Sequence, residues 1–196
     1  MEYGFRKKER IDMANQVNGI LSPFLRQKRF QAIFPFIKGN VLDFGCGIGR
    51  LTKYIKKDNY LGVDIDEISI NIAKKNHSNY KFLLLNSVEE IPGNFDVIVL
   101  LALIEHVKNP EILLSELKNK LNKNGCIVLT TPHPMFEWIH DIGSKIGLFS
   151  SEASEEHETL IDFKQMQKIA NLAGLKMDES QRFLCFANQM FVLSVK

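Results

Sequence analysis

From Asn40 onward, short apolar runs alternate with longer segments in which apolar residues recur at helical spacing. The short runs are typical of buried strands, and the longer segments between them are typical of helices. The predicted strands are Val41–Phe44, Tyr60–Val63, Lys81–Leu84, Val97–Leu100 and Cys126–Thr131, and the predicted helices are Ile48–Lys57, Glu67–Asn76 and Pro110–Leu121. Strands that alternate with helices predict an α/β fold with a mainly parallel sheet.

The pattern changes on both sides of this alternation. Before Asn40, an amphipathic helix is predicted to begin at Ser22-Pro23 and to pack on the domain. Its apolar positions are Phe24, Leu25, Ile33 and Phe34. After Thr131 a helix is predicted only around Phe163–Ala173. The last two runs, Leu175–Phe186 and Met190–Val195, have no helix between them, so they predict a closing antiparallel pair.

Composition narrows the class of protein. The chain has 196 residues, a formal net charge of +2 and 45% hydrophobic residues, which predict one domain and argue against a protein that coats nucleic acid. The longest apolar stretch, Val97–Ile104, is far shorter than the roughly 20 residues of a membrane-spanning helix. The first twenty residues hold no apolar run of a secretory signal, and the three cysteines form no disulfide or zinc pattern. We therefore expect a cytoplasmic protein with no membrane span.

A glycine-rich loop, Gly45-Cys-Gly47-Ile-Gly49, lies between the first predicted strand and the segment after it. Gly45 and Gly47 let the backbone pass close under a ligand, and Gly49 lets neighbouring elements approach each other. A dinucleotide site prefers the spacing G-x-G-x-x-G, whereas this loop has G-x-G-x-G. The carboxylate of Asp43 before the loop would repel a pyrophosphate, but it suits a ligand that carries an ammonium and a sulfonium group.

A second candidate anchor, Asp64, ends the next predicted strand, nineteen residues after Gly45. An acid at that place can accept hydrogen bonds from both hydroxyls of a ribose. Asp66 comes directly before a predicted helix and is better explained as its N-cap. Because dinucleotide enzymes also use such an acid, Asp64 indicates a nucleoside without saying which one.

Three motifs in this order, Val41–Gly49, Gly62–Asp64 and Phe95–Val107, resemble those of the class I S-adenosylmethionine-dependent methyltransferases, and the similarity covers roughly residues 40–131. The resemblance implies a doubly wound, mainly parallel seven-stranded sheet of the Rossmann-like type with an antiparallel last strand. It also implies S-adenosylmethionine (SAM) as cofactor, with S-adenosylhomocysteine (SAH) as its product. We expect residues 1–196 to form one domain, with an N-terminal helical segment (1–39), a cofactor-binding half (40–131), and a substrate lid with the closing strands (132–196).

The resemblance further implies which residues contact the cofactor. They are Asp43, Gly45, Cys46, Gly47, Asp64, Ile65, Asn86, Ser87, Val88 and Leu101. In the family, the counterparts of Asp43 and the glycines meet the methionine end, while those of Asp64 and Ile65 meet the ribose and adenine. Asn86 lies where the family commonly has an acid, and its amide oxygen can still accept from an exocyclic amine. Val88 is explained equally well as a core residue.

Catalysis of methyl transfer leaves little trace in a sequence. The reaction is an in-line displacement, so the protein mainly positions donor and acceptor and excludes water. A base is needed only when the acceptor must lose a proton. His106 and His133 are the candidate catalytic residues, although His106 could instead be a buried, hydrogen-bonded histidine. No metal site is expected, because Ala102 replaces the extra acid of some metal-binding quinone-pathway relatives, and His133, Glu137 and His140 match no zinc pattern.

The substrate is predicted to bind under a lid formed by Pro132–Glu158. This segment mixes aromatic and titratable residues: His133, Phe136, Glu137, Trp138, His140 and His157. The segment Leu100–Leu103 replaces the Asn/Asp-Pro-Pro-aromatic motif of methylases that act on exocyclic amines. A small-molecule acceptor, with oxygen as the methylated atom, is therefore the leading interpretation.

Three other interpretations stay open at this point. A nucleic-acid or tRNA methyltransferase would use two basic clusters, namely Arg6, Lys7, Lys8 and Arg10, and Arg26, Lys28 and Arg29. A nicotinamide-dependent oxidoreductase would share the sheet and Asp64. A cofactor-binding subunit without activity would share the whole donor site. The sequence is compatible with a monomer and with a homodimer.

Overall fold

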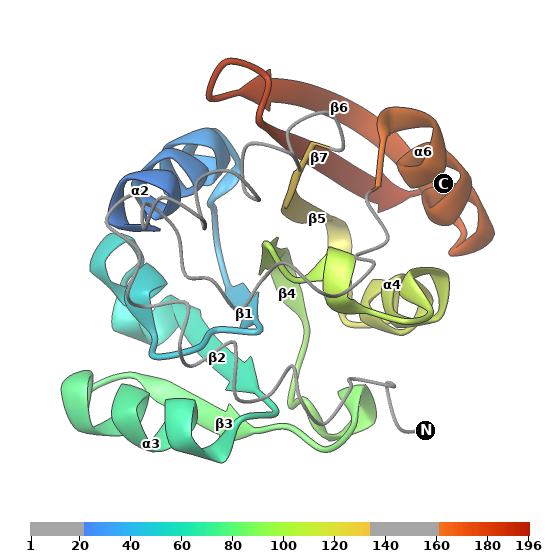
Figure 1. The fold of residues 1–196 in the computed structure, drawn as a ribbon. Coiled ribbons are helices and arrows are strands. Elements are labelled where there is room, and N and C mark those ends of the chain that lie inside the picture. Colours follow the sequence, from blue (N-terminus) through green and yellow to red (C-terminus); the bar gives the residue numbers. More distant parts are fainter. Residues whose placement is uncertain (1–21, 134–160) are drawn as a thin grey trace.

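The structure, a computed structural model, describes residues 22–133 and 161–196, and these residues form one seven-stranded sheet (Figure 1). The strands are β1 (Val41–Phe44), β2 (Tyr60–Asp64), β3 (Lys81–Leu84), β4 (Phe95–Leu101), β5 (Leu121–Pro132), β6 (Leu175–Phe183) and β7 (Asn188–Val195). Their order across the sheet is β3-β2-β1-β4-β5-β7-β6, and β7 runs antiparallel to both of its neighbours. The predicted mainly parallel sheet with an antiparallel last strand is confirmed.

Helices cover both faces of the sheet. They are α2 (Ser22–Ile33), α3 (Glu67–Asn76), α4 (Pro110–Lys118) and α6 (Phe163–Leu172), joined by the short 3₁₀ helices η2 (Phe34–Phe36), η3 (Arg50–Tyr54), η4 (Lys57–Asn59), η5 (Val88–Glu90) and η6 (Ile104–His106). The apolar sides of α2 and α3 pack on one face of the sheet, and those of α4 and α6 pack on the other. Among the described helices, none is both long and apolar enough to cross a membrane.

Alternating side chains of each strand feed the two cores. In β1, Val41 belongs to the core under α2 and α3, whereas Leu42 belongs to the core under α4 and α6. The same alternation holds for Val97 and Ile98 in β4, as the two-residue period of a strand requires. Strands that are apolar on both faces need helices on both faces, which explains the doubly wound arrangement.

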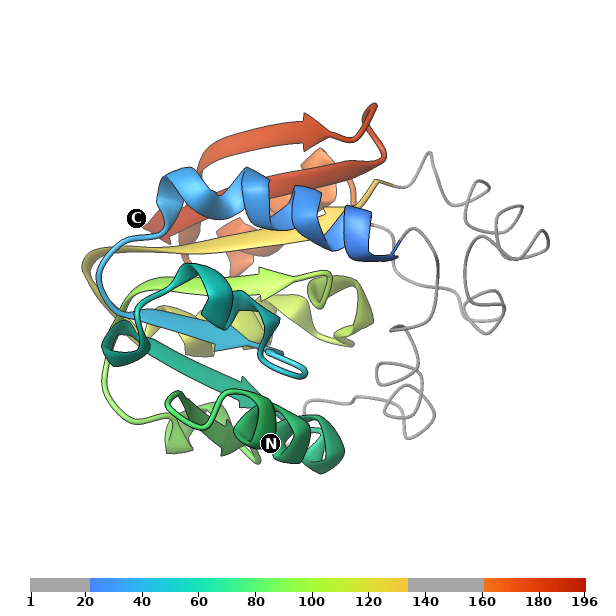
Figure 2. The ribbon, with the colours of Figure 1, turned by 90° about the vertical axis from the view of Figure 1, so that its left-hand side faces the viewer.

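The N-terminal helix follows its prediction in part. Phe30 and Ile33 of α2 are buried against the sheet. Phe24 and Phe34, which were expected on the apolar side, are 49% and 37% exposed. The stripe that packs is therefore shorter than the apolar composition of the segment suggests. In Figure 2 the beginning of α2 lies at the arrowhead edge of the sheet, where the parallel strands end.

The predicted helix Ile48–Lys57 is wrong in type, because the structure has the 3₁₀ helix η3 and a bend there. The Tyr80 hydroxyl donates to the carbonyl oxygens of Thr52 and Ile55, each at 2.9 Å. The Thr52 hydroxyl donates to the carbonyl of Gly49 at 2.7 Å. These side chains occupy carbonyl groups that an α-helix would use for its own backbone bonds.

Other boundaries differ by a few residues. The helix predicted for Pro110–Leu121 ends at Lys118, because Leu121 already pairs with Phe95 as the first residue of β5. Asn109 precedes this helix without a side-chain capping bond. The predicted N-cap Asp66 is confirmed, because its carboxylate accepts from the backbone N–H groups of Ile68 and Ser69.

We expect Gly62→Ala to lower the free energy of unfolding by about 1–3 kcal/mol, the usual range for overpacking a core. A Cβ atom at Gly62 would lie 2.7 Å from Cδ1 of Phe82 and 2.8 Å from the hydroxyl oxygen of Tyr60. Urea denaturation measures the change. Lys81→Ala, an exposed position on the neighbouring strand, is the control and should cost little. Equal stability of Gly62→Ala and wild type would contradict this packing.

Candidate functional site

The glycine loop lies where the strand order of the sheet reverses. From β1 the chain order runs to β2 and β3 on one side and to β4 and β5 on the other. The backbone N–H groups of Gly45 and Cys46 both donate to the carbonyl of Val63 in β2, at 2.8 and 3.0 Å. In open α/β sheets, ligands bind beyond the carboxyl ends of the strands at this switch point.

The three glycines of the loop have different reasons to lack a side chain. All have positive φ, at 78° for Gly45, 51° for Gly47 and 76° for Gly49. A Cβ at Gly45 would lie 2.9 Å from Leu103, and one at Gly49 would lie 2.6 Å from Phe82. A Cβ at Gly47 would meet nothing within 4 Å. Gly45 and Gly49 therefore serve packing, whereas Gly47 borders open space.

Asp64 joins the loop to the end of β2. Its Oδ2 accepts from the backbone N–H of Gly47 at 2.7 Å, and its Oδ1 accepts from that of Asp66 at 3.0 Å. Burial raises the pKa of this carboxyl, and these backbone hydrogen bonds oppose the rise. A carboxylate oxygen offers two lone-pair sites, so each oxygen of Asp64 can accept a further hydrogen bond.

Asp43 lies beneath the loop and is 3% exposed. The Tyr60 hydroxyl donates to its Oδ2 at 2.7 Å. Burial raises the pKa of Asp43 to about 7, the Tyr60 bond opposes the rise, and the charge of Asp64 adds to it. With a pKa of about 7, the carboxyl of Asp43 is ionised only in part at neutral pH, whereas the sequence suggested a carboxylate at this position.

Cys46 is a neutral thiol inside the loop. It is 8% exposed, and its Sγ lies 3.6 Å from the carbonyl oxygen of Gly47. Burial raises the pKa of Cys46, and the carboxyl groups of Asp43 and Asp64 raise it further. Reactive cysteines are thiolates in electropositive surroundings, so the side chain of Cys46 packs rather than reacts.

The residues expected around the adenine follow β2 and β3. Ile65 is half-buried against the core, and Asn86 is exposed, with its amide nitrogen 3.5 Å from a carboxylate oxygen of Glu90. The Ser87 hydroxyl donates to Glu89. The side chain of Val88 is 1% exposed and belongs to the core, as one of its two interpretations expected.

The end of β4 carries strained backbone and a buried acid. Leu101 is half-buried, and Ala102 has a φ of 51°, a conformation that is costly for a residue with a Cβ. The Leu103 side chain packs on Gly45, as its closeness to a Cβ there shows. Glu105 is 5% exposed, and its Oε2 has no hydrogen-bond partner among the described residues. His106 is half-buried.

His133 comes directly after β5, the strand beside β4. It is 7% exposed, and its backbone N–H donates to the carbonyl of Ala187 at 2.9 Å. Burial lowers the pKa of His133, the positive charge of Arg182 lowers it further, and Asp162 opposes both. These influences favour the neutral form of the imidazole.

Parallel strands bring the two candidate histidines to one edge of the sheet. His106 follows β4 and His133 follows β5, and the carboxyl ends of these paired strands meet there. The other predicted lid residues, Phe136, Glu137, Trp138, His140 and His157, lie outside the described residues. Within residues 22–133 and 161–196, no three His, Cys, Asp or Glu side chains come together as a potential metal site.

A cluster of arginines at the same edge was missed by the sequence analysis as part of the site. Burial lowers the pKa of Arg26 in α2, and the positive charges of Arg50 in η3 and Arg29 lower it further. The Arg29 side chain also donates to the amide oxygen of Asn188 at 3.0 Å. Arg50 directly follows the glycine loop, so the positive charge of this cluster lies beside the loop. Arg26 and Arg50 are far apart in sequence, and only the packing of α2 next to η3 brings them together.

Comparison with known families agrees with this geometry. The family model of a methyltransferase domain matches residues 16–180. The chain therefore belongs to this family, and the expected membership of the class I SAM-dependent methyltransferases is confirmed.

This chain matches only part of the length of its curated relatives. The ubiquinone biosynthesis O-methyltransferase of Dechloromonas aromatica (strain RCB) is 25% identical over 151 residues, which are 71% of this chain and 65% of that protein. The mitochondrial ubiquinone biosynthesis O-methyltransferase of Schizosaccharomyces pombe is 34% identical over 101 residues, 46% of this chain and 37% of that protein. The chain thus spans less than two thirds of these relatives.

Solved structures share the fold at low sequence identity. The magnesium protoporphyrin IX methyltransferase of Synechocystis PCC 6803 with bound SAH has a TM-score of 0.67 and 15% identity, and the match covers 96% of this chain and 94% of that one. The [4+2]-cyclase SpnF has a TM-score of 0.65 and 11% identity, over 86% of this chain and 80% of that one. The fold by itself therefore does not specify the reaction.

We expect Asp43→Asn to remove a pH-dependent loss of stability. Between pH 4 and 7 the folded Asp43 holds a proton that the unfolded chain releases, so the free energy of unfolding falls by about 1.4 kcal/mol per pH unit and levels off above pH 7. Denaturation at pH 5 and pH 8 should show the variant gaining about 2.6 kcal/mol relative to wild type as the pH rises.

Asp96→Asn is the matched control for this measurement. Hydrogen bonds from the Asn40 backbone and the Asn122 side chain lower the pKa of Asp96, so it stays ionised from pH 5 to pH 8. Its stability difference from wild type should not change over this range. Parallel pH profiles for Asp43→Asn and wild type would show that the buried carboxyl is not a titrating group.

Proposed function

We propose that the protein transfers a methyl group from SAM to an oxygen atom of a small-molecule acceptor. The observation that carries this proposal is the Asp64 carboxylate, which is bonded to the N–H of Gly47 beside the open space at that glycine. A nucleoside that enters there meets an acceptor for its ribose hydroxyls and a glycine backbone without side chains. Membership of the methyltransferase domain family supports the same assignment.

Each part of the cofactor has a proposed partner in this arrangement. Asp64 receives hydrogen bonds from the ribose hydroxyls with its remaining lone pairs. Ile65 and the segment Asn86–Val88 border the adenine, with Val88 contributing backbone only because its side chain is in the core. The loop Gly45–Gly47 and Leu101 border the methionine end. Asp43 lies beneath that end, and a nearby ammonium group would favour its ionised form.

The arginine cluster supplies the partner of the methionine carboxylate. Arg26 and Arg50 raise the positive potential beside the loop, and the charge of Arg50 helps to lower the pKa of Arg26. A carboxylate bound here would relieve the repulsion between the guanidinium groups. The amino and carboxylate groups of the cofactor would then face the acidic and the basic side of the loop.

In this reaction the protein positions the donor and the acceptor and removes one proton from the acceptor. SAM, when bound, supplies a methyl group on a sulfonium, and the acceptor oxygen attacks this carbon as the sulfur leaves with the bonding electrons. A hydroxyl acceptor must lose its proton, and His133, whose lowered pKa favours the unprotonated imidazole, is the base we propose for it. The half-buried Leu101 and the buried Leu103 reduce access of water to the reacting atoms.

A nicotinamide-dependent oxidoreductase is less well supported. Binding of a pyrophosphate uses the N–H groups at the start of an α-helix that follows the glycine loop. In this chain the five-residue 3₁₀ helix η3 follows Gly49 instead. A subunit that only binds the cofactor would need no base, so a buried histidine, His133, at the strand edge favours an enzyme.

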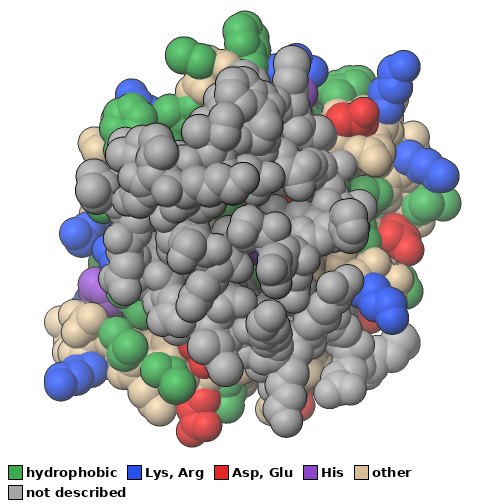
Figure 3. All heavy atoms as spheres, viewed as in Figure 1, with side chains coloured by type: hydrophobic (Ala, Val, Ile, Leu, Met, Phe, Trp, Pro, Cys, Tyr) green, Lys and Arg blue, Asp and Glu red, His purple; other side chains and the backbone are tan. Residues whose placement is uncertain are grey.

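A nucleic-acid methyltransferase finds little support in the described members of the second basic cluster. Lys28 lies 5.6 Å from the centre of the Phe24 ring, and Arg29 is bonded to Asn188. Figure 3 shows basic side chains spread around the rim of one face and interspersed with acidic ones. The other cluster, Arg6–Arg10, lies outside the described residues.

We expect Asp64→Asn to weaken SAM and SAH binding at least ten-fold, because two charge-assisted hydrogen bonds to the ribose become weaker neutral ones. Isothermal titration calorimetry measures the affinities. Asp66→Asn is the control, because asparagine also caps a helix and the change removes the same charge two residues away. Equal losses in both variants would reject a specific role for Asp64.

We expect Arg26→Gln to weaken SAM binding about ten-fold, because it removes a charged partner of the methionine carboxylate. Lys28→Gln, on the same helix but over the ring of Phe24, should change the affinity less than three-fold. Adenosine, which has no methionine group, should bind both variants and wild type equally. An effect of Arg26→Gln on adenosine as large as on SAM would indicate a general disturbance of the site.

A further inference from the structure

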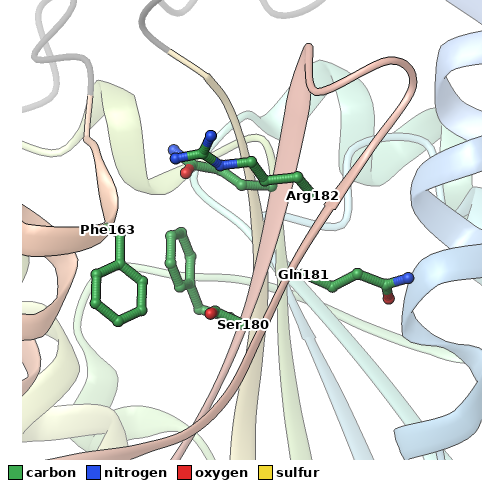
Figure 4. A pocket seen from close by; sticks show the side chains of 6 residues that line it. Phe163, Ser180, Gln181 and Arg182 are labelled. Atoms are coloured by element: carbon green, nitrogen blue, oxygen red, sulfur yellow. The ribbon is translucent and has the colours of Figure 1, made fainter.

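A pocket outside the donor site lies between α6 and the β6–β7 pair (Figure 4). It contains about 310 Å³ of empty space and is open to solvent. Its lining residues are Phe163, Ser180, Gln181, Arg182, Gln189 and Phe191. Figure 4 shows the Ser180 and Arg182 side chains pointing to the side on which Phe163 lies, while the Gln181 side chain points to the opposite side.

Strand register builds the floor of this pocket. Ser180 is paired with Phe191, and Arg182 is paired with Gln189. Phe191 and Gln189 are 1% and 2% exposed, and the Gln189 amide nitrogen donates to the carbonyls of Ile161 and, at 3.4 Å, Pro132. A fixed apolar and amide floor therefore lies beneath an exposed guanidinium group.

The guanidinium group of Arg182 has no partner among the described residues. It forms no hydrogen bond or ion pair with any of them. The nearby acid Asp162 accepts a backbone N–H bond from Gln165 at 2.8 Å, as the N-cap of α6. Arg182 lowers the pKa of His133, so its charge acts on the proposed base. The pocket thus holds one positive charge near His133, the proposed base.

We infer that this pocket binds a carboxylate of the methyl acceptor, with Arg182 as its charged partner. The inference rests on the proposed function and names the substrate class. A planar carboxylate matches the two-pronged donor geometry of a guanidinium group. A single arginine suits a monoanion, whereas a phosphate dianion would call for more positive charge. Phe163 and Phe191 offer contact to an apolar or aromatic body next to the carboxylate.

The position of the pocket also restricts the shape of the acceptor. Strands β5 and β7 separate β6 from β4. At about 4.8 Å per strand, the pocket strand lies roughly 14 Å from the strand whose end borders the donor site. The carboxylate and the methylated oxygen therefore lie at opposite ends of an elongated acceptor. Arg182 would set specificity without touching the reacting atoms.

Ligand titrations followed by NMR test this inference on the full chain saturated with SAH. Benzoate is the probe, benzamide is its neutral counterpart and phenyl phosphate is the competing anion. We expect benzoate to bind wild type, to bind Arg182→Gln at least ten-fold more weakly, and to bind Arg182→Lys with intermediate affinity. Benzamide should bind at least ten-fold more weakly than benzoate, and phenyl phosphate should not bind more tightly than benzoate.

Lys176→Gln is the matched control, because it removes one positive charge from the same strand at the exposed ion pair with Asp178. Benzoate affinity should be unchanged in this variant, and SAH affinity should be unchanged in all three. The inference that Arg182 binds a carboxylate in this pocket would be wrong if benzoate did not bind wild type. It would also be wrong if Lys176→Gln and Arg182→Gln lost benzoate affinity equally. Tighter binding of phenyl phosphate would overturn the choice of carboxylate. Failure of wild type to bind SAH would instead overturn the proposed function.

Discussion

The hydrogen bond from the Gly47 backbone to Asp64 is the constraint on which the proposed cofactor site depends. It fixes the tip of the glycine loop to the end of the neighbouring strand at 2.7 Å. The N–H groups of Gly45 and Cys46 fix the base of the loop to Val63 of the same strand. A loop held at both points needs little reordering when a ligand arrives, which lowers the entropic cost of binding. The ligand then meets a carboxylate whose geometry is already set.

The residues around the glycine loop also lower the stability of the fold. Asp43, Tyr60, Cys46 and Asp64 are all at least nine-tenths buried, and burial raises the pKa of each of them. Two acids buried close together destabilise each other when both are ionised. Ala102 adds a left-handed backbone conformation at the end of β4. Strain and buried charge that gather at one edge of a sheet are typical of functional sites, and the apolar cores on both faces compensate for them.

Periodicity predicted most of the fold, because each core strand is short, apolar and bounded by turn residues, as Val41–Phe44 shows. It failed at Ile48–Lys57, where the hydroxyl of Tyr80, 25 and 28 residues away, binds two backbone carbonyls. For the site, spacing predicted the glycine loop and Asp64, but it could not show that burial makes Asp43 titrate near neutral pH. Arg26, Arg50 and Arg182 carried no local signal, because only tertiary contacts place them beside the loop or in a pocket.

The central claim is that the loop and Asp64 form a nucleoside site for SAM. Calorimetric titration of the wild-type protein with SAM, SAH and NAD in parallel tests it most directly. The account predicts binding of SAM and SAH at micromolar concentrations and no binding of NAD. Binding of NAD without SAM or SAH would contradict it, and so would the absence of heat from all three ligands.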